Sequence, residues 1–187
     1  EKGLLGSKHW VANPTIDLSR IRIMVNMDMI GRYDFKNQLT VYGIRTAPGL
    51  RQLITRQNDN PNLKLDFNWE IRSNSDHYPF FSRGIPYYML HTGLHPDYHK
   101  PSDDADKLDT RGMQAITRLG FQLIHELANR PSLPAFRAAA RHETLTDQRA
   151  AEQPAAPLPP RLGIGWDSRG DHRNGLVVTN VSYGSAA

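Results

Sequence analysis

Apolar residues fall into short blocks along the chain, and the first two blocks predict a helix and a strand. Residues 4–11 are good helix formers and stop at Asn13-Pro14, which is typical of a helix end. Residues 21–27 form a nearly continuous apolar run, which predicts an inner strand covered on both faces. Asp28 follows at once, so a carboxylate lies at the carboxyl end of that strand.

The middle of the chain has a β-α-β rhythm. Residues 38–44 and 63–69 alternate as strands, and 47–57 between them have helical spacing. A short capped helix over 75–81 and an apolar strand over 87–91 follow. This order predicts an α/β domain, in which ligands collect at the carboxyl ends of the strands.

A long amphipathic helix begins at Asp109 or Thr110 and extends to about Asn129, and Pro131 ends it. Its apolar stripe consists of Met113, Ile116, Leu119, Gly120, Leu123, Ile124 and Leu127. Residues 131–160 are rich in Ala, Pro, Glu and Gln, which predicts a semi-extended linker. Residues 162–166 and 176–181 then predict two strands of a small β-rich unit.

Composition narrows the classes of function. The 187 residues are 39% hydrophobic, enough for one well-buried core. The net charge is +4, but the basic residues are scattered singly among 19 acidic ones, so we expect no nucleic-acid partner. The chain has no cysteine, so a metal would be held by His, Asp and Glu. No apolar stretch reaches the roughly 20 residues of a membrane span.

The segment Asp97-Tyr98-His99-Lys100-Pro101-Ser102-Asp103 carries residues suited to a metal site. A ligating histidine is neutral and usually passes its second ring N–H to a carboxylate, for which Asp97 and Asp103 are candidates. Tyr98 is able to donate a hydrogen bond to an oxygen that gains charge when a carbonyl is attacked. The alternative is a solvated turn, which composition alone favours.

Four motifs in one order make the chain resemble the M28 zinc metallopeptidases, the co-catalytic di-zinc aminopeptidases. They are Glu1-Lys2-Gly3-Leu4-Leu5-Gly6-Ser7, Asn26-Met27-Asp28-Met29-Ile30-Gly31-Arg32, Ser75-Asp76-His77-Tyr78-Pro79-Phe80 with Gly84-Ile85-Pro86, and the 97–103 segment leading to Asp106-Lys107-Leu108-Asp109. The resemblance implies that 1–130 is the C-terminal part of a catalytic domain. The implied fold is a three-layer α/β/α domain with a mixed, largely parallel central sheet.

The same resemblance implies a set of site residues. Glu1 would bind one zinc ion as the second of a glutamate pair, His99 would share that ion, and Asp28 would bind the other. Tyr98 would stabilise the oxyanion. Taken without the resemblance, Glu1 is a fraying terminal glutamate, Asp28 is more commonly a helix or turn cap after a strand, and Tyr98 is more often a packing residue.

Two further carboxylates and the other histidines are expected to have supporting or structural roles. Asp76 and Asp103 are expected to orient the ligands without binding metal, although Asp76 is equally well a helix N-cap. His77 is expected to be structural. Four other histidines lack a second ligand at useful spacing and are expected to be ordinary surface or core residues, namely His9, His91, His125 and His142.

The resemblance implies that the family's complete site also contains a His-x-Asp motif and a general-base glutamate, both upstream of the position of Glu1 and so not among these 187 residues. For the intact protein the resemblance implies two zinc ions, an activated water and a hydrolase that removes N-terminal residues from peptides or proteins. We expect the chain alone to be inactive. Two alternatives are a carboxypeptidase- or glutaminyl-cyclase-type enzyme on the same scaffold, and a non-catalytic peptidase-like binding protein.

The tail over 161–187 resembles the opening of a PDZ domain, cut short. The resemblance rests on Leu162-Gly163-Ile164-Gly165 and on 177–181 followed by Gly184-Ser185-Ala186-Ala187. It implies a peptide ligand for this β-rich segment, whereas the alternative is an unrelated β-hairpin. Because family members with such a unit are often exported, a periplasmic or extracellular location is expected.

Overall fold

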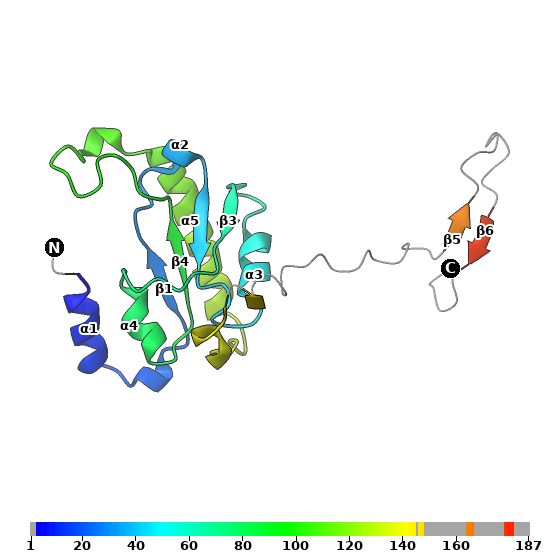
Figure 1. The fold of residues 1–187 in the computed structure, drawn as a ribbon, viewed down its shortest axis with the longest axis horizontal. Helices are drawn as coiled ribbons and strands as arrows, with labels where there is room; N and C mark the ends of the chain where they lie inside the picture. Colours follow the sequence, from blue (N-terminus) through cyan, green and yellow to red (C-terminus); the bar gives the residue numbers. More distant parts are fainter. Residues whose placement is uncertain (1–2, 145, 148–163, 167–177, 182–187) are drawn as a thin grey trace. The chain divides into compact units, whose positions relative to one another are not determined.

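The computed structural model describes residues 3–144, 146–147, 164–166 and 178–181, and the chain divides into two compact units, Glu1–Glu143 and Thr144–Ala187 (Figure 1). The elements of the first unit are α1 (Leu5–Ala12), η1 (Leu18–Arg20), β1 (Met24–Met27), α2 (Tyr33–Lys36), β2 (Leu39–Tyr42), α3 (Leu50–Gln57), β3 (Leu65–Phe67), α4 (His77–Ser82), β4 (Tyr87–His91), η2 (Ala105–Lys107), α5 (Thr110–Ala128) and η3 (Ala138–Arg141). The described strands of the second unit are β5 (Ile164–Trp166) and β6 (Val178–Val181).

A four-stranded mixed sheet in the order β1-β4-β2-β3 forms the centre of the first unit. The strands of the β1–β4 and β2–β3 pairs run parallel, and those of the β2–β4 pair run antiparallel. The β2-α3-β3 segment is the predicted β-α-β unit. The predicted mixed, largely parallel sheet is thus confirmed for the described strands.

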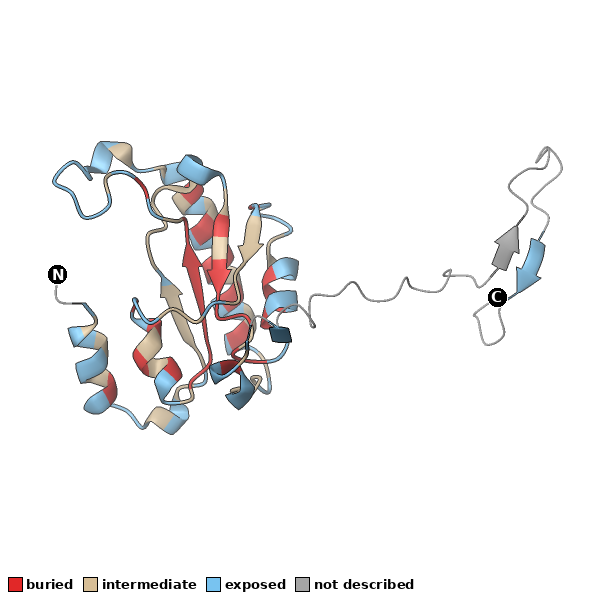
Figure 2. Ribbon diagram, viewed as in Figure 1, coloured by how far each residue is buried: buried red, intermediate tan, exposed pale blue. Residues whose placement is uncertain are grey.

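Helices cover both faces of this sheet (Figure 1). Successive residues of a strand point to opposite faces, so Tyr88 and Leu90 of β4 pack with α3 and α5, whereas Tyr87 and Met89 pack with α4. All four side chains are buried, and Figure 2 shows β4 and β2 as the buried centre of the unit. The three-layer α/β/α architecture is therefore confirmed.

Helix α5 begins and ends close to its predicted limits. Asp109 caps it, because its carboxylate accepts a 2.9 Å hydrogen bond from the Gly112 N–H. Leu119 and Leu123 are fully buried against the sheet, as the apolar stripe predicts. Ile124 departs from the prediction with an exposed fraction of 45%, because a position 100° around the helix from Leu123 lies at the rim of the packed face.

Among the described strands, β4 is the neighbour of β1 on one side and none lies on the other, so the prediction of an inner strand for β1 stays a prediction. Both of its faces are covered, with Met24 against the α4 side and Val25 against the α5 side. Met27, at its end, is 43% exposed. A continuous apolar run indicates that both faces of a strand are covered. It does not indicate which strands lie next to it in the sheet.

Residues 131–143 belong to the first unit, although the predicted linker begins at 131. The Phe136 ring meets the Phe81 ring edge to face, with 5.7 Å between centroids. Glu143 accepts hydrogen bonds from Arg45 Nη2 at 2.5 Å and from Arg137 Nη2 at 2.6 Å. These few large side chains anchor a segment whose Ala and Pro content is typical of a linker. The rest of the predicted linker lies largely outside the described residues.

In the second unit, β5 and β6 pair antiparallel, with Ile164 opposite Val181 and an irregularity between Gly165 and Trp166. The two predicted strands are thus present, while most of the 161–187 segment lies outside the described residues. Its PDZ-like identity therefore stays a prediction. Among the described helices, none has both the length and the apolar character needed to cross a membrane.

Candidate active site

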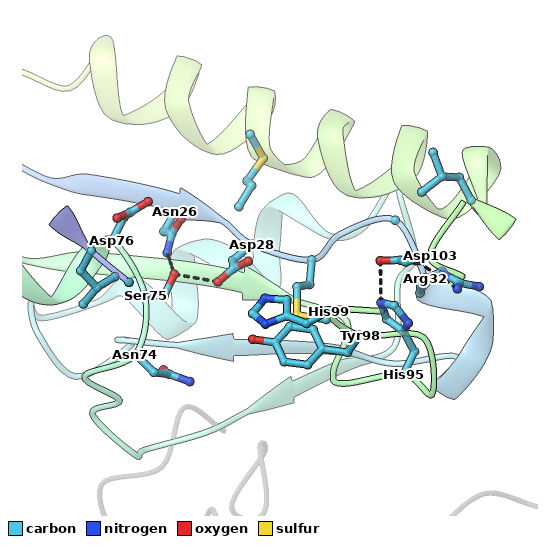
Figure 3. A pocket seen from close by; sticks show the side chains of 16 residues that line it. Asn26, Asp28, Arg32, Asn74, Ser75, Asp76, His95, Tyr98, His99 and Asp103 are labelled. Atoms are coloured by element: carbon cyan, nitrogen blue, oxygen red, sulfur yellow. Dashed lines mark hydrogen bonds and ion pairs between the residues drawn. The ribbon is translucent and has the colours of Figure 1, made fainter. Parts of the chain in front are cut away.

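A cavity of about 500 Å³ opens beside the carboxyl end of β1 (Figure 3). Five of the predicted site residues line it, namely Asp28, Asp76, Tyr98, His99 and Asp103. Asp28 follows β1, Asp76 precedes α4, and the other three come from the loop after β4. Glu1, the sixth predicted residue, lies outside the described residues. The fold thus brings segments far apart in the sequence to one cavity.

Asp28 is held by a short chain of side-chain hydrogen bonds, drawn as dashed lines in Figure 3. The Ser75 hydroxyl donates to Asp28 Oδ2 at 2.7 Å, and the Asn26 amide donates to Ser75 Oγ at 2.8 Å. Asn26 and Asp28 share one side of the chain because side chains alternate along a strand. The other carboxylate oxygen, Oδ1, has no hydrogen-bond partner among the described residues, which suits a metal ligand better than a turn cap.

His77 lies behind this chain of hydrogen bonds and is fully buried. Its Nε2–H donates to the Arg72 carbonyl at 2.7 Å, so Nδ1 is the acceptor facing the Asn26 amide at 3.4 Å. Its ring stacks on Tyr87 with 4.3 Å between centroids. Burial lowers the pKa of His77, and the Arg72 carbonyl opposes that shift only in part. His77 is therefore a neutral core residue that supports the cavity wall.

Tyr98 and His99 lie together on the loop between β4 and α5. Their rings stack with 3.9 Å between centroids, and His99 adopts a left-handed backbone conformation with φ of 56°. Tyr98 is 39% exposed, and its hydroxyl has no hydrogen-bond partner among the described residues. Its hydroxyl is available to donate to a molecule in the cavity.

The two carboxylates that flank this pair are bound by cations. Asp97 accepts hydrogen bonds from Lys107 Nζ at 2.7 Å, Ser102 Oγ at 2.8 Å and Arg32 Nη2 at 2.8 Å. Lys107 and then Ser102 are the main reasons why the pKa of Asp97 lies well below its usual range. Asp103 lies 3.3 Å from Arg32 Nη2. The contacts found for both carboxylates are thus with neighbouring cations and a hydroxyl.

Asp103 has a second neighbour, His95, whose Nε2 lies 3.8 Å from Asp103 Oδ2. The His95 side chain is only 5% exposed. Asp76 occupies the N-cap position of α4, but its side chain forms no capping hydrogen bond and lines the cavity instead. The predicted orienting roles of Asp76 and Asp103 stay predictions.

Sequence reasoning missed Asn26, Ser75 and Arg32 as parts of the site, although all three stand inside the quoted motifs. A period-of-two argument from Asp28 would have found Asn26, because both side chains share one side of β1. No local signal identifies Ser75 or Arg32, since their partners lie far away in the sequence. Their roles depend on how the sheet is assembled.

The ligand chemistry fits zinc in part. Asp28 offers a carboxylate oxygen and His99 an imidazole nitrogen, and zinc accepts both types of ligand. Within the described part of the chain, no group of three or more His, Cys, Asp or Glu side chains stands where it could hold a metal ion. Zinc in proteins takes about four ligands. The described residues can therefore supply part of a zinc site.

Comparisons with known proteins find solved structures with a similar fold. The LapA aminopeptidase of Legionella pneumophila has a similar fold, with 23% identity and a TM-score of 0.59, and the match covers 69% of this chain and 37% of LapA. An aminopeptidase from Aneurinibacillus sp. strain AM-1 also has a similar fold, with 25% identity and a TM-score of 0.56, and the match covers 72% of this chain and 31% of that protein. A third structure is BSAP, a zinc aminopeptidase from Bacillus subtilis, with 24% identity and a TM-score of 0.57, and the match covers 66% of this chain and 32% of BSAP. The chain thus spans about a third of the length of these proteins.

No curated protein shows a significant sequence match to the chain. The family comparison is decisive, because the model of Peptidase family M28 matches residues 1–124. This match includes all the cavity residues described above and covers more than half of the chain. The chain therefore belongs to peptidase family M28.

Proposed function

We propose that this chain is part of a zinc-dependent aminopeptidase that hydrolyses the N-terminal residue from peptides or proteins. The observation that carries the proposal is the placement of Asp28, Tyr98 and His99 around one cavity, in a chain of peptidase family M28. The similar solved structures are aminopeptidases, and BSAP is described as a zinc enzyme. A cavity that is open to solvent and lined by polar side chains such as Asp28 and Tyr98 suits a hydrolase.

Asp28 would hold one zinc ion, and His99 would hold a second together with Glu1. Support comes from the cavity they share and from the Asp28 Oδ1 oxygen, which has no partner among the described residues. Bound zinc would polarise the scissile carbonyl and lower the pKa of a water molecule. Ser75 and Asn26 keep the Asp28 carboxylate in one orientation, which is what neighbours of metal ligands commonly do.

Tyr98 would donate its hydroxyl proton in a hydrogen bond to the oxygen that becomes negative when the carbonyl is attacked. Such a donor is effective when it is already in place before the reaction. Stacking on His99 and the edge contact with His95, at 6.5 Å between centroids, restrict the Tyr98 ring. The hydroxyl is thereby held near the proposed metal ligand without being engaged by another described residue.

We further propose that a bridging carboxylate and the general base come from residues encoded before Glu1. The chain spans about a third of the similar structures, and the described residues supply only part of a zinc site. Activity should therefore require the upstream-extended protein, meaning this chain expressed with the residues encoded before Glu1. Residues 1–187 alone should bind zinc weakly, increasingly so at low pH, where protons compete for His99.

The test compares the purified 187-residue chain with the upstream-extended protein, each supplied with zinc and an aminoacyl p-nitroanilide. Hydrolysis is expected only from the extended protein. His99→Ala in the extended protein should abolish it, whereas His125→Ala, an exposed site on α5, should not. Hydrolysis by the 187-residue chain at the rate of the extended protein would overturn the proposed division of the site.

We also propose a PDZ-like domain for the second unit and export for the protein. The described antiparallel pair of β5 and β6 is compatible with a PDZ-like domain that begins near 161 and binds peptides. Binding of C-terminal peptides to the upstream-extended protein, and its loss when 161–187 are deleted, checks this role. Recovery of the protein outside the cytoplasm after fractionation checks the proposed export.

A further inference from the structure

Arg32 lies four residues after Asp28, and its guanidinium contacts both ends of the segment that carries Tyr98 and His99. Its Nη2 atom lies 2.8 Å from Asp97 Oδ2 and 3.3 Å from Asp103 Oδ1. The Arg32 side chain is only 15% exposed, so these ion pairs are shielded from solvent more than ordinary surface pairs. One side chain thus joins the end of β1 to both sides of the loop.

Among the described residues, backbone hydrogen bonds join the end of β1 to this loop only near the two limits of the loop. The Thr92 N–H donates to the Met29 carbonyl at 3.4 Å, and the Asp109 N–H donates to the Gly31 carbonyl at 2.9 Å. Between these limits, the described salt bridges from the end of β1 to the loop are both formed by Arg32. Arg32 therefore anchors the part of the loop nearest the cavity to the end of β1.

The loop conformation needs such a tie. His99 has a left-handed backbone conformation, which is strained for a residue other than glycine and persists when its surroundings enforce it. Local turns contribute, because the Lys100 N–H donates to the Asp97 carbonyl at 2.9 Å. These turns fix the shape of the loop, but they do not fix where it sits relative to Asp28.

The two carboxylates depend on Arg32 to different degrees. Asp97 keeps Lys107 and Ser102 as partners if Arg32 is removed. Asp103 keeps only His95 as a charged or polar side-chain neighbour, at 3.8 Å, among the described residues. Removal of Arg32 should therefore release the Asp103 side of the loop first, immediately after His99.

We propose that Arg32 is a positioning residue, which holds the loop carrying Tyr98 and His99 at a fixed place relative to Asp28. This inference rests on the proposed zinc aminopeptidase function. Arg32 acts through the loop and needs no contact with metal or substrate. Because Asp28 and Arg32 follow the same strand, the guanidinium sets the separation between the two proposed zinc ligands.

The test uses Arg32→Gln and Arg32→Lys in the upstream-extended protein, with Arg130→Gln as the matched control. Arg130 also forms a partly exposed ion pair, with Glu126 at 3.0 Å, but it lies at the end of α5. Zinc affinity is measured by competition with a chelator, and kcat and KM are measured separately. Circular dichroism melting confirms that each variant is folded.

Arg32→Gln should lower zinc affinity about 10–100-fold, the usual effect of losing a group that orients a ligand. It should lower kcat by a larger factor than it changes KM, since Tyr98 acts in the transition state. Arg32→Lys should restore part of the affinity, because an ammonium pairs with one carboxylate but lacks the planar fork of arginine. Arg130→Gln should match the wild type in all three quantities.

Hydrogen exchange provides a readout that does not depend on activity. In the 187-residue chain, Arg32→Gln should accelerate amide exchange over 97–103, while Arg130→Gln should leave it unchanged. Wild-type exchange rates and zinc affinity in Arg32→Gln would overturn the inference. Its failure is distinguishable from that of the proposed function, because a wild-type extended protein without zinc-dependent hydrolysis contradicts the function alone.

Discussion

Lowering the pH from about 7.5 to about 5 should destabilise the first unit through His77. This side chain is fully buried, donates through Nε2–H to the Arg72 carbonyl and accepts from Asn26 at Nδ1. A proton on Nδ1 would face the Asn26 amide, which is also a donor, and would lose that hydrogen bond. Burial is the main reason why the pKa of His77 is lowered in the folded protein.

The sign of the effect follows from proton binding. In the unfolded chain a histidine has a pKa of about 6.5, so below this pH the unfolded state binds a proton that folded His77 does not. Stability is therefore present above about pH 6.5 and is lost as the pH falls toward the lower folded-state pKa. The free energy of unfolding should decrease by at most about 1.4 kcal/mol per pH unit for this one group.

Urea unfolding of the 187-residue chain, followed by circular dichroism at several pH values, measures this loss. His77→Gln cannot titrate, so its free energy of unfolding should fall less steeply with decreasing pH than that of the wild type. Burial lowers the pKa of His91 as well, and that contribution remains in both proteins. His125→Gln makes the same change at an exposed site and should keep the wild-type slope. Parallel curves for wild type and His77→Gln would refute the reasoning.

Three further substitutions test other parts of the account. Ser75→Ala should weaken zinc binding to the upstream-extended protein about 10–100-fold, measured by chelator competition, because Asp28 loses its orienting hydroxyl. Phe136→Ala should lower the free energy of unfolding by about 1–3 kcal/mol in urea, less than for a fully buried ring, whereas a linker residue would cause no change. Gly43→Ala should cost more than about 2 kcal/mol by the same assay, since its Cβ would lie 2.5 Å from the Tyr87 carbonyl oxygen and its φ is 79°.

Elements with a clear period could be predicted from the sequence almost to the residue. Strand β4 coincides with the predicted 87–91, and α5 starts after the predicted cap Asp109. In both cases local preference and tertiary burial agree. The position of β1 at one side of the four described strands could not be predicted, because an apolar pattern indicates which faces are covered and not which strand lies alongside.

Segments whose order depends on a few long-range contacts were also missed. Residues 131–143 have the composition of a linker, and their attachment depends on Phe136 and on the two arginines that bind Glu143. Nothing in the local sequence marks those pairings. A semi-extended segment and a segment fastened by such contacts are indistinguishable from composition alone.

The site was predictable to the extent that its residues follow strand ends. Asp28 directly follows β1, and His99 lies in the loop after β4, so the topology of an α/β sheet brings them to one cavity. Their supporting residues were not predictable. Ser75 and Arg32 act on partners that are distant in the sequence, and only the assembled sheet shows that they meet.

The central claim is that this chain is part of a zinc-dependent enzyme that removes N-terminal residues. The most direct measurement follows one peptide, with either a free or an acetylated N-terminus, incubated with the metal-free upstream-extended protein before and after zinc is restored. We expect zinc to restore release of the first residue from the free peptide and to leave the acetylated peptide intact. Cleavage that persists without metal, or that begins at the C-terminus, would contradict the account.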